Sequence, residues 1–141
     1  MLFHSPTSRH CAGVLKAGES KQIVLLRESD RATFIVFSDD APIGIAALYR
    51  LPDQPDVGEV LQVWVAPEYR GTGAARDLMD AVFEWAGNNI FRAIVARITN
   101  GNARALRFYR KYGFALTNEA SLNSSDGVTL VREVESEQSL R

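Results

Sequence analysis

The sequence predicts an α/β domain built on a mixed sheet, mostly antiparallel, with a central parallel strand pair and helices on both faces. Three observations predict it. An apolar hairpin pattern occupies residues 33–49, a strand pattern at 59–65 leads through a glycine-rich turn into an amphipathic helix, and an almost unbroken apolar run follows at 91–98. A strand, a helix and a second strand in this order favour a right-handed crossover, which makes the two strands parallel.

The hairpin is the first element with clear boundaries. Thr33 to Phe37 is rich in β-branched and aromatic residues, Ser38 to Pro42 contains turn formers, and Ile43 to Tyr49 is a second apolar run. About thirty residues precede it, and none forms a convincing strand, although Gln22 to Leu26 fits either a helix end or a strand. We therefore expect a short or atypical N-terminal part over residues 1–32.

Two helices follow the hairpin. The first shows apolar residues three and four positions apart and ends near Gly87 and Asn88. The residues expected on its core face are Ala75, Leu78, Met79, Val82, Trp85 and Ala86. Those expected on its outer face are Arg76, Asp77, Asp80 and Glu84. The second runs from Ala103 to Lys111 and stops at Gly113. A last antiparallel strand, Val128 to Glu135, follows a polar loop at 118–127, and only the first dozen residues and the stretch 136–141 look loose.

Composition limits the protein class. A chain of 141 residues fits one domain over 1–141, and a net charge of −1 makes nucleic acid an unlikely partner. No apolar stretch is long enough to span a membrane. The single cysteine, Cys11, cannot form an internal disulfide, and the first residues lack the apolar core of a signal peptide, so we expect a cytoplasmic protein.

The turn after the strand at 59–65 has the chemistry of a phosphate-binding elbow. The first N–H groups of a helix lack intrahelical partners and lie at the positive end of its dipole, and Gly71 and Gly73 let an anion approach the backbone closely. A nucleotide P-loop is excluded because Ala74 and Ala75 replace its Lys-Ser/Thr pair. The dinucleotide fingerprint fails because Arg76 occupies its sixth position, where a small residue is needed.

The pattern that fits is Arg70-x-x-Gly73-x-Ala75, which resembles the acyl-CoA pyrophosphate loop of the GNAT superfamily of acetyl-CoA-dependent N-acetyltransferases. A second segment resembles the superfamily's N-x-x-A-x-x-F-Y-x-x-x-G-F signature at Asn102, Ala105, Phe108, Tyr109, Gly113 and Phe114. From Glu59 to Phe114 the resemblance covers about two fifths of the chain. It implies a GNAT-like fold, acetyl-CoA as cosubstrate and no metal.

The resemblance also implies which groups bind the cofactor. The backbone N–H groups of Val63 and Val65, freed where neighbouring strands splay beside a bulge, would pair with pantetheine and polarise the carbonyl. The elbow would hold the pyrophosphate through Arg70, Gly71, Thr72, Gly73, Ala74 and Ala75. Asn102 either reaches the pantetheine amides or caps the second helix. Trp64 is expected in the core, as are Phe108 and Tyr112, whereas Arg76, Arg104 and Arg107 are expected on solvated helix faces.

The resemblance also implies two candidate side chains for proton transfer. Glu59, at the start of the strand before the elbow, is the candidate general base, and its alternative is a solvated glutamate at a strand end. Tyr109 is the candidate acid at the leaving sulfur and also binds cofactor, and its alternative is a place in the aromatic core of a short helix. His4, His10 and Cys11 have no metal-binding spacing and form no nucleophile–base pair.

The resemblance therefore implies an N-acetyltransferase in which acetyl-CoA and a primary amine bind together and react by direct attack. A non-catalytic acyl-CoA-binding or interaction module is the alternative from another class. The acceptor is a small-molecule or peptide amine, no membrane is involved, and a homodimer that completes the acceptor pocket is left open. Acidic residues in two loops, Asp53 and Asp56 in one and Glu119 and Asp126 in or beside the other, either steer a cationic acceptor or are acidic only because these loops are solvated.

Overall fold

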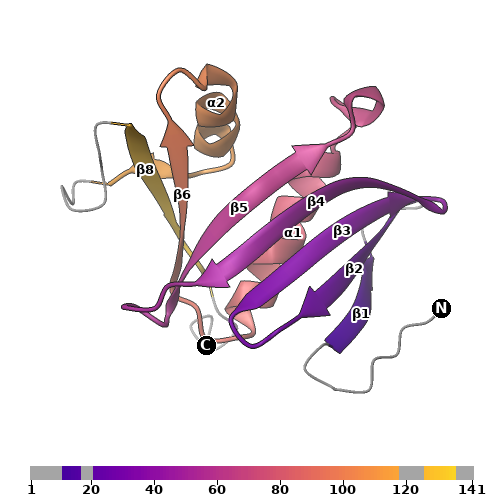
Figure 1. Ribbon diagram of the computed structural model, residues 1–141, viewed down its shortest axis with the longest axis horizontal. Coiled ribbons are helices and arrows are strands. Elements are labelled where there is room, and N and C mark those ends of the chain that lie inside the picture. The colour runs from indigo at the N-terminus through magenta and orange to yellow at the C-terminus, as the bar shows by residue number, and fades with distance from the viewer. Residues whose placement is uncertain (1–10, 17–20, 118–125, 136–141) are drawn as a thin grey trace. The chain divides into compact units, whose positions relative to one another are not determined.

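The computed structural model describes residues 11–16, 21–117 and 126–135 (Figure 1). The chain divides into two compact units, one of Met1–Tyr49 with Leu61–Trp85 and one of Arg50–Val60 with Ala86–Arg141. Strand β5, Val57–Val65, runs from the second unit into the first. A single domain over residues 1–141 stays a prediction.

The first unit is an antiparallel sheet whose strands follow one another in sequence. It contains β1 (Cys11–Lys16), β2 (Lys21–Arg27), β3 (Arg31–Ser38) and β4 (Ala41–Arg50), each paired with the next. The predicted hairpin is confirmed as β3 and β4, joined at Asp39 with a φ of 54°. The expectation that no convincing strand precedes Thr33 is wrong, because β1 and β2 do so, and of the two alternatives for Gln22 to Leu26 the strand is confirmed as part of β2. Ile23 to Leu26 is an unbroken apolar run, whose pattern does not distinguish a strand from a helix end.

Helix α1, Ala74–Gly87, packs on one face of this sheet. Phe34 meets Trp85 edge to face with ring centres 6.1 Å apart, and Arg27 lies over the same indole at 5.6 Å. A side chain at Gly44 would stand 3.0 Å from Val36 and 3.2 Å from Leu78, so glycine here allows the helix its close approach. Leu78, Met79, Val82 and Ala86 are buried as predicted.

The second unit holds the parallel pair. The first half of β5 runs parallel to β6 (Ala93–Thr99), β6 is antiparallel to β8 (Gly127–Glu133), and β8 is antiparallel to the short strand β7 (Ala115–Leu116). Helix α2, Ala103–Lys111, has the predicted boundaries. β7 was not predicted because two residues are too few for a periodic pattern. The part of the polar loop at 118–125, the tail at 136–141 and the first ten residues lie outside the described residues.

The fold class is confirmed: the strands form a mixed, mostly antiparallel sheet with one parallel pair among the described strands, accompanied by two helices. Within the described ranges, no helix is long and apolar enough to cross a membrane.

Candidate functional site

The glycine-rich elbow lies in the first unit, between β5 and α1. A short 3₁₀ turn, η1 (Pro67–Tyr69), precedes it, and both Gly71 and Gly73 have positive φ, 84° and 91°. The Asp77 N–H donates to the Gly73 carbonyl at 2.9 Å, which is the first bond of the helical ladder. The N–H groups of residues 74–76 therefore point out of the helix N-terminus, where they can bind an anion.

The side chains of the elbow stabilise the turn. Arg70 Nε donates to the Val65 carbonyl at 3.1 Å, and Thr72 Oγ1 donates to the Tyr69 carbonyl at 2.5 Å. These bonds fix the backbone that presents the N–H groups, and the role of both residues as pyrophosphate ligands stays a prediction.

Lys21, on β2, adds a cation to the elbow that the sequence did not reveal. Its Nζ forms a 2.7 Å ion pair with Asp77 Oδ2 and donates to the Thr72 carbonyl at 3.3 Å. The same Nζ lies 4.0 Å from where a side chain at Gly73 would begin. Asp77, expected on the outer face of α1, is instead half-buried by this pair. The pair compensates a carboxylate that would otherwise repel an anion at the elbow.

Strand β5 is irregular just before the elbow. Gln62 has a φ of 61°, and the buried positions change from Gly58 and Val60 before it to Val65 after it. A residue with this positive φ changes which face of the strand the following side chains occupy, as a β-bulge does. The expectation that Trp64 lies in the core is wrong, because this shift leaves the indole 51% exposed.

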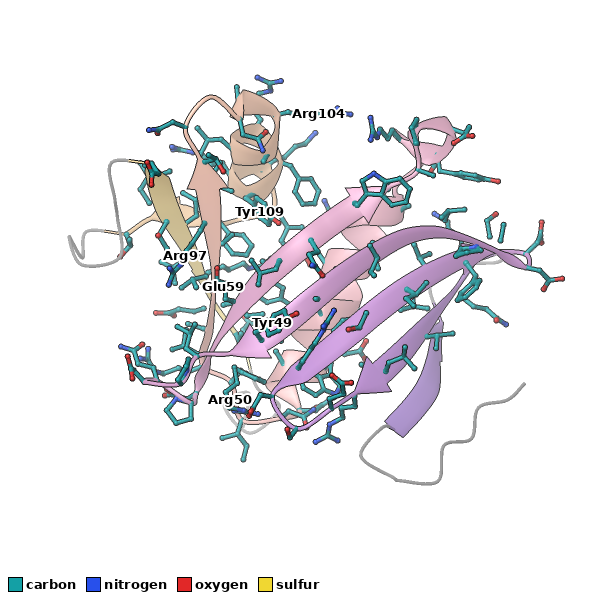
Figure 2. The ribbon with its side chains drawn as sticks, viewed as in Figure 1. Tyr49, Arg50, Glu59, Arg97, Arg104 and Tyr109 are labelled. Atoms are coloured by element: carbon teal, nitrogen blue, oxygen red, sulfur yellow. The ribbon has the colours of Figure 1, made fainter. Side chains whose placement is uncertain are left out.

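Glu59 and Arg97 form an ion pair in the second unit (Figure 2). Glu59 lies in register with Val95 across the parallel pair, and Arg97 follows two residues along β6, so both side chains leave the same face. Glu59 Oε2 is 3.5 Å from Arg97 Nε, with the glutamate side chain 15% exposed and the arginine 53%. Glu59 is therefore largely buried, in contrast to the solvated strand-end alternative.

Tyr109 is the buried aromatic residue of α2, and its label in Figure 2 marks it beside β6. Its ring contacts those of Phe108 and Phe114 edge to face, each with centres 5.2 Å apart. Burial raises the pKa of Tyr109 to about 12, so its hydroxyl keeps its proton near neutral pH. Phe108 and Tyr112, both expected in the core, are only half-buried.

Asn102 caps α2: its side-chain oxygen accepts from the Ala105 N–H at 3.1 Å. The capping alternative is thus confirmed, and its amide N–H₂ group is not used by the cap. Arg76, Arg104 and Arg107 are exposed as expected.

The sequence pattern of the acetyltransferase (GNAT) family matches residues 4–114. The chain belongs to this family. It is 32% identical over 113 residues to uncharacterised N-acetyltransferases of Mycobacterium bovis and Mycobacterium tuberculosis, a match that covers 77% of this chain and 71% of each relative. An N-acetyltransferase 9-like protein of Caenorhabditis briggsae is 30% identical over 107 residues, which cover 67% of this chain and 54% of that protein. As a family member, the protein is an acyltransferase.

Solved structures of the same fold resemble this GNAT protein. The PaiA N-acetyltransferase of Thermoplasma acidophilum, solved in complex with coenzyme A, has a TM-score of 0.65 at 17% identity and covers 74% of this chain and 61% of its own. The ribosomal-protein-S18-alanine N-acetyltransferase of Escherichia coli has a TM-score of 0.64 at 14% identity, over 77% and 72%. At such identities the likeness shows the fold.

Two residues of the candidate site were missed from the sequence. Arg97 interrupts an apolar strand at a position where both neighbours, Ala96 and Ile98, are buried, and that isolated charge was the available signal. Lys21 gave no local signal, because its partners lie about fifty residues away in the chain.

Proposed function

We propose that the protein is an N-acetyltransferase that moves the acetyl group of acetyl-CoA to a primary amine by direct attack, with both substrates bound together. The observation that carries the proposal is the elbow: two glycines with positive φ open a helix, and the first N–H groups of a helix have no intrahelical partners, in a chain of the GNAT family. No acetyl-enzyme is needed, because the amine itself attacks the thioester.

Acetyl-CoA supplies an activated acyl group when it is bound. The elbow holds its pyrophosphate through the backbone of Gly71, Gly73, Ala74 and Ala75, with Arg70 and Thr72 beside them. The N–H groups of Val63 and Val65, after the irregularity at Gln62, pair with the pantetheine and polarise the thioester carbonyl. The free amide N–H₂ group of Asn102 is a further donor to pantetheine.

Glu59 is the proposed general base. An alkylamine with a pKa near about 10.4 is neutral in only roughly one molecule in a thousand at pH 7, so removing its proton lowers the barrier. In the reaction the C–N bond forms, the C–S bond breaks, and the amine proton leaves through Glu59. The largely buried carboxylate has the Arg97 guanidinium beside it, with Nε 3.5 Å from Oε2.

Tyr109 is the proposed donor at the sulfur. With a pKa of about 12 it lies roughly 3.5 pKa units above a thiol, so complete proton transfer to the thiolate would cost on the order of 5 kcal/mol. A hydrogen bond from the hydroxyl stabilises the charge that develops on sulfur without that cost. We therefore refine the predicted acid to a hydrogen-bond donor, and the thiolate takes its proton from solvent or from the protonated base.

A free-thiol release assay with acetyl-CoA and a panel of amines tests the activity. Coenzyme A at a hundred times its Kd should stabilise the native state by about 2.7 kcal/mol, which a thermal-shift measurement detects, whereas NAD and ATP should give no shift. Stabilisation by CoA without thiol release from any amine would favour the non-catalytic acyl-CoA-binding module instead.

Glu59→Gln is expected to lower turnover most at low pH, because there the amine is most often protonated and most needs a base. The matched control is Glu68→Gln, an exposed glutamate in η1, which should leave the pH profile unchanged. A loss from Glu59→Gln that is equal at every pH would reduce Glu59 to a positioning role.

We also propose a cytoplasmic enzyme with a small-molecule or peptide acceptor and no metal. A single cysteine and a net charge of −1 support this setting, and the charge makes nucleic acid an unlikely partner. The comparison with a ribosomal-protein N-acetyltransferase keeps peptide amines among the candidates. Sedimentation velocity tests whether the protein forms a homodimer.

A further inference from the structure

A carboxylate and a guanidinium lie side by side on one face of the β5–β6 strand pair. Glu59 and Arg97 leave this face together, as their register requires. Arg132, in register with Ile94, leaves the opposite face, where it donates to the Tyr112 carbonyl at 2.8 Å. The end of α2 is therefore packed on the side away from the pair, and the pair presents both signs of charge at one place.

The Glu59–Arg97 pair is looser than two other ion pairs among the described residues. Lys21 and Asp77 are 2.7 Å apart and Arg92 and Asp56 are 2.6 Å apart, whereas Glu59 and Arg97 are 3.5 Å apart, beyond the usual length of an N–H···O bond. A guanidinium has five N–H donors in a planar fork. In Arg97 the Nε is the atom paired with Glu59. The Arg97 side chain is 53% exposed, and its Nη groups are donors that suit a second carboxylate.

A purely cationic amine does not suit this place. Glu59 attracts it, but Arg97, whose Nε lies 3.5 Å from the Glu59 carboxylate, repels it, so the two charges act against each other. A molecule with an ammonium next to a carboxylate satisfies both, because its ammonium meets Glu59 and its carboxylate meets the guanidinium fork. Asp56, expected to steer cations, is itself paired with Arg92.

We propose that Glu59 and Arg97 form the acceptor subsite and that the acceptor class is the α-amino acids. This inference rests on the proposed acetyltransferase function. Glu59 removes the proton from the α-ammonium, while Arg97 holds the α-carboxylate throughout the reaction and determines specificity.

Matched pairs of acceptors test the proposal: each of the common amino acids against its own carboxamide, in the thiol-release assay. The carboxamide has the less basic amine, so intrinsic reactivity at neutral pH favours it. We expect the best free acid nevertheless to exceed its carboxamide by roughly tenfold to hundredfold in kcat/KM, as loss of a charged hydrogen bond implies. Equal values, or a preference for the carboxamide, would overturn the proposal.

Arg97→Gln and Arg92→Gln form a matched pair of variants, since each removes an arginine from an ion pair in the second unit. Arg97→Gln should lower kcat/KM for the free acid by roughly tenfold or more and leave the carboxamide within about twofold. Arg92→Gln should leave both unchanged. An equal loss for acid and carboxamide in Arg97→Gln would mean that Arg97 only positions Glu59, which contradicts acceptor binding.

Calorimetric titration of the same acceptors into the protein loaded with CoA separates this inference from the proposed function. Binding of free acids and not of carboxamides, lost in Arg97→Gln, supports the subsite even if no thiol is released. Thiol release from simple amines without any preference for a carboxylate supports the transferase and overturns the subsite. Absence of binding by every amino acid also overturns it.

Discussion

The elbow of the first unit and the Glu59–Arg97 pair of the second recognise charge by different means. The elbow uses main-chain N–H groups, and its geometry depends on the φ values of two glycines close together in sequence. The pair uses side chains that come from separate strands and meet only through the register of β5 with β6. A backbone site tolerates changes at its side chains, whereas a side-chain site depends on each of its members.

Gly73→Glu should have the largest effect, because it places a carboxylate where the pyrophosphate binds. We expect no stabilisation of this variant by CoA up to millimolar concentration. The stabilisation of roughly 2.7 kcal/mol that CoA at a hundred times its Kd gives the unchanged protein is then lost. Gly73→Ala is the matched control: it adds strain at a φ of 91° without a charge and meets nothing nearer than Lys21 Nζ. An unchanged thermal shift in Gly73→Glu would remove the elbow from the site.

Tyr109→Phe should come next, with turnover lowered by about a hundredfold and CoA affinity almost unchanged, because the phenyl ring keeps the packing and loses only the hydrogen-bond donor to the developing charge. Steady-state kinetics and calorimetry measure the two quantities. Tyr112→Phe, on the same helix, serves as control and should retain turnover. Wild-type turnover in Tyr109→Phe would leave Tyr109 a core residue only.

The raised pKa of Tyr109 also predicts a pH dependence of stability. Below about pH 10 the phenol is neutral in folded and unfolded chains; between about pH 10 and 12 only the unfolded chain loses the proton, so stability falls. The loss is about 1.4 kcal/mol per pH unit, and Tyr109→Phe lacks it. Urea unfolding of both proteins at pH 9 and 11 measures the difference, and parallel behaviour would contradict the burial of the hydroxyl.

Lys21→Met should weaken CoA binding by roughly tenfold, because Asp77 is then an uncompensated charge at the elbow. The double variant Lys21→Met with Asp77→Asn should recover most of the affinity in calorimetry. Pantetheine, which has no phosphate, should bind all variants alike. If the double variant binds CoA as weakly as Lys21→Met does, compensation is not the role of Lys21.

The smallest effect is expected from Asp53→Asn with Asp56→Asn. Asp56 is paired with Arg92, so its charge is already balanced, and exposed pairs contribute little to stability, about 1 kcal/mol or less. The kcat/KM of the best acceptor should stay within about twofold at low and physiological salt. A steep salt dependence that these substitutions abolish would restore cation steering by the loops.

Local patterns predicted most of the fold and the elbow. The hairpin, both helices and the parallel pair each follow from a period or a turn within a few residues, as α2 shows by matching its predicted ends. Trp64 was predicted in the core, but the positive φ of Gln62 reverses the alternation of side chains along β5 and leaves the indole exposed. A glycine would have indicated such a backbone conformation in the sequence, and a glutamine does not. Glu59 was found by its place before the elbow, but its partner Arg97 depends on strand register, which periodicity does not supply.

The exposure of Trp64 gives the protein an intrinsic optical reporter. The chain has two tryptophans, and they differ: the Trp64 indole is 51% exposed on β5, whereas Trp85 is half-buried beside Phe34 and under Arg27. Emission should therefore divide into a red-shifted part that iodide quenches strongly and a part that it quenches less. Because Trp64 lies between Val63 and Val65, any ligand that pairs with this strand shields the quenchable indole, and occupancy can be followed without a label.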